Sequence, residues 1–126
     1  MKAAACSGRT LAYLGDAVWS LLVRRDLIEQ GEGRGIDLQR KTVSYVSAKA
    51  QAAIYDALHE EGFFTPDEEE NFRRGRNANA GSVPKNTPVP IYRKSTGFEA
   101  VIGALELEEN RQRIEEIWQK VRTLKR

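Results

Sequence analysis

Two acidic residues stand in otherwise apolar segments, where their carboxylates could bind a divalent cation. Asp16 is the only residue of segment 11–23 that is ionised at neutral pH, and Glu99 is the only charged residue of segment 98–105. A carboxylate in apolar surroundings costs free energy unless it is hydrogen-bonded, paired or bound to a metal. Mg²⁺ prefers oxygen ligands and keeps several of its waters, so two converging carboxylates can hold it. Such an ion can activate water and stabilise charge on a phosphate.

A glycine accompanies each acid. Gly15 directly precedes Asp16, and Gly103 follows Glu99 by four residues, one helical turn. Glycine inside a helix costs about 1 kcal/mol relative to alanine, so these two indicate that two helices approach closely beside the acids. From the residues alone a structural role stays open, because each acid could instead be hydrogen-bonded to a helix N-terminus or paired with an arginine in the core.

The spacing of the apolar residues predicts helices throughout, and therefore an all-α chain that forms one domain, residues 1–126. The expected helices cover residues 10–29, 37–62, 65–76, 92–108 and 111–124. Thr10 or Ser7 should cap the first helix and Asp37 the second, and Thr65 with Glu68 has capping-box spacing. The first helix is apolar nearly all round, so we expect it to be buried. A proline-rich loop is expected at 77–90, a length that favours a functional role.

Composition narrows the class of protein. The chain has 126 residues, a formal net charge of +2, one cysteine and one histidine. Cys6 can form no disulfide within the chain, which favours a reducing compartment, and His59 is too far from it in sequence to suggest a catalytic pair. No segment approaches the roughly 20 apolar residues that span a bilayer. We expect a cytoplasmic protein without a membrane partner.

The segments around the two acids resemble a known family. Residues 11–18 (LAYLGDAV) resemble the signature helix of ribonuclease III catalytic domains, and residues 98–103 (FEAVIG) resemble their second acidic motif. Segments 44–52, 74–78, 82–86 and 92–96 are similar to the Mini-ribonuclease III branch, which lacks the double-stranded-RNA-binding domain. The resemblance extends over most of residues 10–120.

This resemblance implies the ribonuclease III catalytic fold and a metal-dependent endoribonuclease that cuts double-stranded RNA, leaving 5′-phosphate and 3′-hydroxyl ends. By motif, Asp16 and Glu99 would be the catalytic acids and the ligands of Mg²⁺, for which Mn²⁺ could substitute. The family further implies a homodimer whose two sites each cut one strand, precursor 23S ribosomal RNA as substrate, and ribosomal proteins as partners. Longer members carry further acids, whereas this chain has Thr96 three residues before Glu99 and no glutamate shortly before Gly15.

Without a separate binding domain, the chain needs a basic surface for duplex RNA, which is recognised mainly through phosphates and 2′-hydroxyls. Segment 72–94 contains six Lys or Arg and no Asp or Glu. This segregation favours phosphate contacts over an ordinary solvated loop, the simpler alternative. Asn77, Asn79, Ser82 and Asn86 could add hydrogen bonds to sugar edges. The main candidates for RNA binding are Arg73, Arg74, Arg76, Asn77, Lys85, Asn86, Arg93, Lys94 and, on the second expected helix, Lys49.

Two other functions compete with the nuclease. One is a catalytically inactive RNA-binding or ribosome-assembly module on the same fold, and the other is a helical adaptor between proteins. The presence of both Asp16 and Glu99 argues for the hydrolase, because a protein that only binds RNA has no need of acids that face a phosphate backbone.

Overall fold

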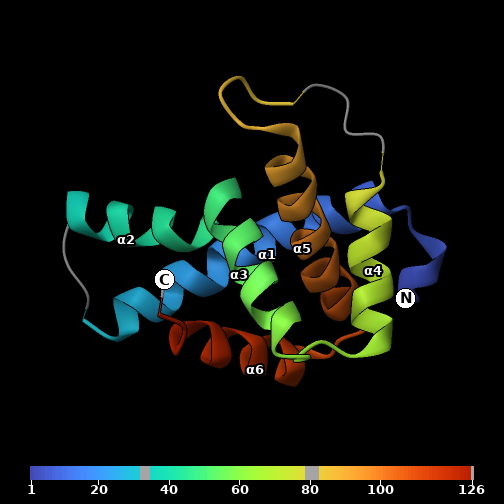
Figure 1. The fold of residues 1–126 in the computed structure, drawn as a ribbon. Coiled ribbons are helices and arrows are strands. Elements are labelled where there is room, and N and C mark those ends of the chain that lie inside the picture. Colours follow the sequence, from blue (N-terminus) through green and yellow to red (C-terminus); the bar gives the residue numbers. More distant parts are fainter. Residues whose placement is uncertain (32–34, 79–82, 126) are drawn as a thin grey trace.

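The structure is a computed structural model that describes residues 1–31, 35–78 and 83–125, and these residues form helices and no strand, as predicted (Figure 1). A short 3₁₀ helix, Ala3–Ala5, precedes six α-helices. The α-helices are α1 (Gly8–Glu29), α2 (Ile36–Val46), α3 (Ala48–Glu60), α4 (Pro66–Arg76), α5 (Val89–Leu107) and α6 (Arg111–Arg122). Within the described ranges, no helix is both long and apolar enough to cross a membrane.

Local sequence signals account for where several helices begin. Ser7, one of the two expected caps, accepts a hydrogen bond from the backbone N–H of Thr10 at 3.1 Å and starts α1. Thr65 and Glu68 form the predicted reciprocal capping box at the start of α4. Such caps satisfy backbone donors that have no partner within the helix, and each contributes on the order of 1 kcal/mol.

The single helix predicted over 37–62 is wrong, because Ser47 divides it into α2 and α3. Ser47 has extended backbone angles (φ −65°, ψ 157°), and its side chain accepts from the backbone N–H of Ala50 at 3.1 Å. Serine is a favourable N-cap residue, because its hydroxyl accepts from a backbone N–H of the first helical turn. At Ser47 this cap ends α2 and starts α3. Asp37 is not the cap of α2 either. It lies in the first turn of α2, where its negative charge interacts favourably with the positive end of the helix dipole.

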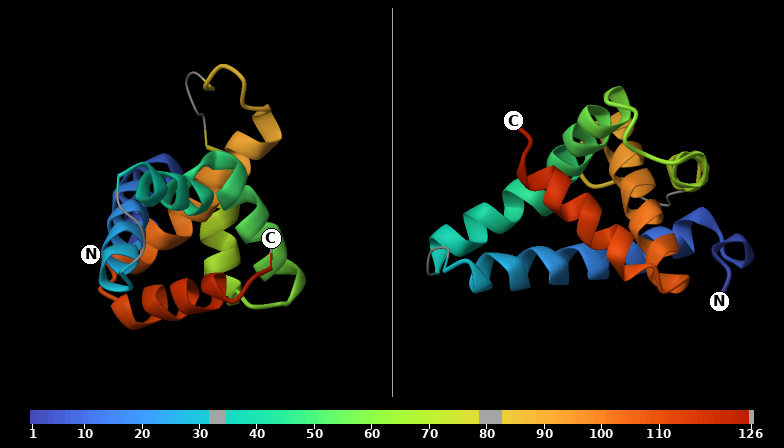
Figure 2. Two further views of the ribbon diagram at one scale, coloured as in Figure 1. Left: turned by 90° about the vertical axis from the view of Figure 1, so that its left-hand side faces the viewer. Right: turned by 90° about the horizontal axis from the view of Figure 1, so that it is seen from below.

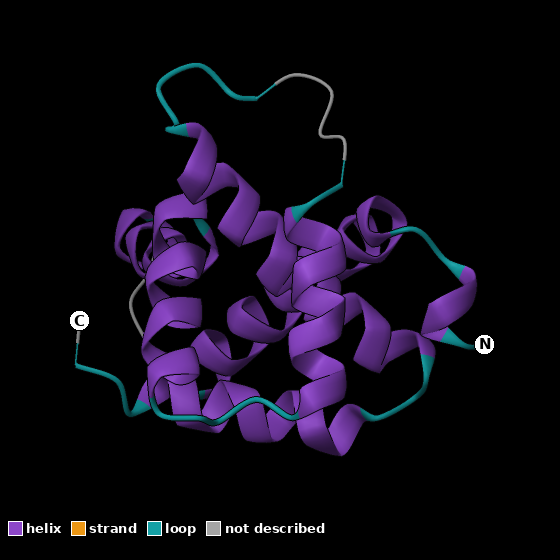
Figure 3. Ribbon diagram, turned by 45° about the vertical axis from the view of Figure 1, so that its right-hand side comes forward, coloured by secondary structure: helices purple, strands orange, loops and turns teal. Residues whose placement is uncertain are grey.

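Helix α5 is the central element of the fold, with α1, α3 and α4 packed around it (Figures 1 and 3). Its residues 100–104 are all buried. Helix α6 lies along the α1 side of the molecule and closes the core from below (Figure 2). The aromatic centre joins three helices: the ring of Trp19 meets Phe98 edge-on at 4.9 Å and Trp118 at 5.5 Å, centroid to centroid.

Helix α1 is not buried all round, contrary to the prediction. Trp19 and Val23 on one face are fully enclosed, whereas Tyr13, Leu21 and Ile28 are 83%, 61% and 62% exposed. The apolar pattern of α1 is therefore wider than the face that the core of one chain covers, which is the behaviour of a helix with a second packing surface.

The two predicted glycines bring α1 and α5 into backbone contact. A Cβ at Gly15 would lie 1.7 Å from the carbonyl oxygen of Glu99, and one at Gly103 would lie 1.9 Å from that of Leu11. No side chain fits at such distances, so only glycine permits this crossing. The prediction of a close helix approach beside the acids is confirmed, and the crossing brings the helix turns that carry Asp16 and Glu99 together.

The loop expected at 77–90 ends at Pro88, two residues earlier than predicted. Helix α5 begins at Val89, and Pro90 lies in its first turn, where a missing N–H costs nothing. Asn79 and Ser82, named above as candidates for sugar contacts, lie outside the described residues.

Candidate active site

Asp16 on α1 and Glu99 on α5 line one cavity beside the glycine crossing. The cavity has a volume of about 220 Å³. The Asp16 side chain is exposed, whereas Glu99 is partly buried. The residues that line the cavity are Arg9, Ala12, Tyr13, Asp16, Ala78, Tyr92, Thr96 and Glu99. The two acids predicted from the sequence are thus neighbours, and the space between them opens to solvent.

The surroundings of Glu99, including the like charge of Asp16, disfavour its ionised form. Burial, the charge of Asp16 and a side-chain hydrogen bond with Asp16, in that order of size, together raise the pKa of Glu99 to about 8. A hydrogen bond from Gln51 opposes the rise. Desolvation and a like charge both disfavour the ionised form of a carboxyl group. These effects favour the protonated form of Glu99 at neutral pH when no cation is bound beside it.

Neither acid has the structural partner that the sequence left open. Asp16 and Glu99 form no ion pair with any residue that the structure describes, and neither caps a helix. Arg113, the most enclosed arginine with an ion pair, instead pairs with Glu68 on α4 at 2.8 Å. The electrostatic cost at the crossing is consequently not offset by an ion pair with any described residue.

The donor set suits a hard divalent ion that keeps part of its water shell. Two carboxylates converge, and within the described ranges no group of three or more His, Cys, Asp or Glu side chains is positioned to hold a metal. Mg²⁺ is commonly bound through one or two carboxylates with waters and phosphate oxygens as the remaining ligands. Asp16 and Glu99 therefore fit Mg²⁺, and Mn²⁺ by the same chemistry, and do not resemble a closed structural metal site.

The cavity also contains Arg9, a cation outside the set of residues predicted from the sequence. Arg9 lies on α1 seven residues before Asp16, two helical turns away and on the same face. Arg9 is exposed and makes no hydrogen bond or ion pair with the described residues. The helical spacing alone could have placed it beside Asp16. Its guanidinium is available for an anion that reaches the acids.

Four of the predicted RNA-binding cations are already engaged within the chain. Arg74 donates to the backbone carbonyls of Cys6 and Ala3 and so fastens the N-terminal segment onto α4. Arg73 is paired with Glu70, Lys94 is paired with Asp56, and Arg76 lies over the ring of Phe72 and donates to Asn77. Arg74 is consequently better explained as a structural residue, while the other three are exposed or partly exposed and keep some capacity for phosphate.

Three predicted cations have no such engagement. Lys49 at the start of α3, Lys85 in the loop and Arg93 in the first turns of α5 are exposed and form no ion pair or hydrogen bond with the described residues. Asn86 is also exposed and adopts φ +75°, which asparagine tolerates better than most residues. Together with Arg9, these cations are the strongest candidates for phosphate contacts.

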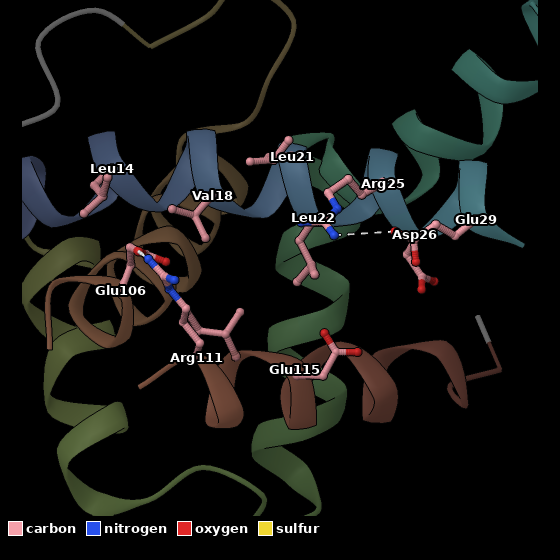
Figure 4. Close-up of a pocket in the computed structure, with 11 residues that line it drawn as sticks. Leu14, Val18, Leu21, Leu22, Arg25, Asp26, Glu29, Glu106, Arg111 and Glu115 are labelled. Atoms are coloured by element: carbon pink, nitrogen blue, oxygen red, sulfur yellow. Dashed lines mark hydrogen bonds and ion pairs between the residues drawn. The ribbon is translucent and has the colours of Figure 1, made fainter. Parts of the chain in front are cut away.

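Another cavity lies away from the two acids. A groove of about 480 Å³ runs between α1 and α6, and Leu14, Val18, Leu21 and Leu22 of α1 form its apolar wall (Figure 4). Charged residues at its edge include Arg25, Glu106 and Arg111. The groove contains none of the residues of the acid cavity, and its walls suit packing against an apolar surface.

Comparison with known proteins agrees with this arrangement. The chain matches the family model described as Ribonuclease III domain over residues 9–110. It is 46% identical over 111 residues to Mini-ribonuclease 3 of Streptococcus pneumoniae, covering 88% of this chain and 87% of that protein. It is 42% identical over 115 residues to Mini-ribonuclease 3 of Staphylococcus aureus, covering 91% and 86%. A crystal structure of a protein from Fusobacterium nucleatum superposes with a TM-score of 0.80 at 31% identity, covering 91% and 92%.

Proposed function

The chain belongs to the ribonuclease III family, within its Mini-ribonuclease 3 group, and from this premise we propose that it is a Mg²⁺-dependent endoribonuclease that cleaves double-stranded RNA. Membership alone supports an endoribonuclease and the ribonuclease III fold. The finer proposal is carried by one observation: Asp16 and Glu99 line the same solvent-open cavity, and neither forms an ion pair with a described residue.

In this mechanism Asp16 and Glu99 would hold the metal. When bound, a divalent ion supplies an activated water and stabilises the charge that develops on the phosphate. The protein contributes position: the glycine crossing fixes the two helices, and with them the turns that carry the acids. Arg9 at the same cavity attracts the phosphate and holds it near the acids. The expected products carry a 5′-phosphate and a 3′-hydroxyl.

A non-catalytic RNA-binding or ribosome-assembly module on the same fold is the competing function. In such a module the free cations Lys49, Lys85 and Arg93 would bind phosphates. Asp16 and Glu99 would weaken RNA binding, because their charges repel phosphate unless a cation lies between them. Burial, and after it the charge of Asp16, raises the pKa of Glu99, so placing the two acids together has an electrostatic cost. Such cost is typical of functional sites, where groups are arranged for chemistry rather than for stability.

We further propose that the active form is a homodimer. The exposed apolar side of α1 and the groove beside it provide a surface that the monomer leaves uncovered (Figure 4). A two-fold dimer presents two equivalent sites, which suits a duplex whose two strands must both be cut. Precursor 23S ribosomal RNA is the proposed natural substrate, which would place the protein in the cytoplasm among ribosomal proteins.

A cleavage assay tests the function. Long duplex RNA incubated with the protein and Mg²⁺ should be cut to short fragments, EDTA should stop the cutting, and Mn²⁺ added in excess should restore it. Single-stranded RNA of the same sequence serves as the control and should be cut far more slowly. Intact duplex in the presence of Mg²⁺, with the RNA nevertheless bound, would favour the non-catalytic module.

The free cations should carry the salt-dependent part of RNA binding. We expect the double variant Lys85→Ala, Arg93→Ala to bind duplex RNA more weakly and to flatten the plot of log affinity against log salt concentration by roughly one to two units, since each neutralised phosphate contributes just under one. Binding is measured in EDTA, so that no cleavage occurs.

The matched control is Arg73→Ala, which also removes an exposed arginine but one that is already paired with Glu70. Its effect on the slope should be clearly smaller. Equal losses per charge removed for the free cations and for Arg73 would mean that net charge, rather than this set of residues, governs binding.

A further inference from the structure

Gln51 is the most enclosed polar side chain near the candidate site. It lies on α3 between Ala50 and Ala52 and is only 1% exposed. Burying an amide costs free energy unless its polar atoms are hydrogen-bonded. An apolar residue would fill the same space without that cost, so the amide calls for a reason other than packing.

The two ends of the amide are treated differently. Its nitrogen, Nε2, donates to the carbonyl oxygen of Val46 at 3.1 Å and to Oε2 of Glu99 at 3.4 Å. Its oxygen, Oε1, is buried and has no hydrogen-bond partner among the described residues. Turning the amide over would place Oε1 against two acceptor oxygens, so the observed orientation is the one that these neighbours require. The amide therefore directs its N–H donor at Glu99, while its oxygen accepts no hydrogen bond from the described residues.

We propose that Gln51 is a positioning residue that holds the Glu99 carboxylate toward Asp16, so that the two acids can bind one divalent cation. The inference rests on the proposed function, and it assigns a part in that function to a helix that carries neither acid. Among the described residues of α3, Gln51 is the one with a hydrogen bond to either acid.

The Gln51 contact has the properties expected of support for a metal ligand. At 3.4 Å it is long for a neutral hydrogen bond, but it strengthens when the acceptor is an ionised carboxylate. Hydrogen bonds to metal-binding carboxylates fix their orientation, and loss of one typically lowers metal affinity 10–100-fold.

A purely structural role predicts a different response. If the amide serves only to tie the first turn of α3 to Val46 across the break at Ser47, its removal should lower stability and leave metal binding unchanged. If it serves Glu99, an apolar residue of similar size should lower metal affinity with little loss of stability, because the same change removes a buried oxygen without a partner.

The test compares the wild type with Gln51→Met and Gln51→Leu. Thr42→Val is the matched control, since Thr42 is also buried and donates to a backbone carbonyl, that of Leu38, without touching either acid. Mn²⁺ affinity is measured without RNA by calorimetry, together with thermal unfolding of each variant. We expect Mn²⁺ binding to weaken roughly 10–100-fold in both Gln51 variants and to stay unchanged in Thr42→Val. Two substitutions of different shape guard against a single variant that fails to fold.

Cleavage as a function of Mg²⁺ concentration gives the second readout. The Gln51 variants should need correspondingly more Mg²⁺ for half-maximal rate and should approach the wild-type rate at saturation. Unchanged Mn²⁺ affinity and an unchanged Mg²⁺ midpoint in folded Gln51 variants would overturn the positioning role while the nuclease assignment stands. Absence of both metal binding and cleavage in the wild type would overturn the proposed function itself, and this inference with it.

Discussion

Replacing Glu99 with glutamine, or Asp16 with asparagine, is expected to slow RNA cleavage by about a thousand-fold or more while the protein stays folded. Each change keeps the shape of the side chain and removes one of the two charges that face the cavity. A thousand-fold loss corresponds to roughly 4 kcal/mol of transition-state stabilisation, within the range that a bound metal contributes. The measurement is the single-turnover rate on duplex RNA at saturating Mg²⁺.

The same Glu99→Gln change should alter how the stability of the metal-free protein depends on pH. A carboxyl group whose pKa is raised on folding, here to about 8, stabilises the folded state when protonated. That stability is fully present below the pKa of the unfolded chain, is lost as pH rises, and is gone above about 8. In EDTA, unfolding of the wild type should therefore become easier between about pH 4.5 and 8, by at most a few kcal/mol, and the variant should lack this part of the fall.

Asp26→Asn is the control for the cleavage measurement. Asp26 lies on the same helix as Asp16 but outside the acid cavity, and it accepts from the Gln30 side chain. Its loss should leave the cleavage rate within a few-fold of the wild type. A cleavage rate that survives in Asp16→Asn or Glu99→Gln would show that the chemistry is carried by other residues.

Gly15→Ala and Gly103→Ala are expected to lower the free energy of unfolding by about 3 kcal/mol each and to reduce cleavage in proportion to the displacement of the acids. The added methyl groups would meet backbone oxygens at 1.7 Å and 1.9 Å, so α1 and α5 must move apart. Because backbone atoms cannot turn aside as a side chain can, the whole crossing has to shift. In thermal unfolding we expect a drop of roughly 10 °C.

The sign of the effect distinguishes this explanation from helix propensity. Propensity alone predicts that glycine to alanine stabilises a helix by about 1 kcal/mol. Ala17→Gly, at an exposed position of the same helix, measures that propensity effect in this protein. Alanine variants as stable as the wild type would contradict the close crossing.

Much of the fold could be predicted because its signals are local. The Thr65–Glu68 capping box and the apolar periodicity fix where α4, α5 and α6 lie to within a few residues. The break at Ser47 was missed because the apolar stripe runs on across it, and a cap is visible only when the pattern also stops. The exposure of α1 could not be predicted for another reason. An apolar helix face has the same sequence pattern whether it packs against the core of the chain or against a second surface.

The acid pair could be predicted because a lone charge on an apolar helix conflicts with its surroundings. The residues that support the pair gave weaker signals. Gln51 shares a helix face with Ile54 and Leu58, so its burial could be predicted from the sequence. Its contact with Glu99 could not, because the two positions are 48 residues apart. Arg74 appeared to belong to a basic stretch, yet it binds the carbonyl of Cys6, 68 residues away. Long-range partners of this kind follow from packing and not from local pattern.

The direct test is to locate the metal. Crystals grown or soaked with Mn²⁺ and measured at a wavelength where manganese scatters anomalously should show one strong peak per chain, within about 2.5 Å of a carboxylate oxygen of both Asp16 and Glu99. The same peak should be missing in Asp16→Asn. A Mn²⁺ ion bound away from these two carboxylates, or carboxylates that hold no ion at concentrations that support cleavage, would contradict the account.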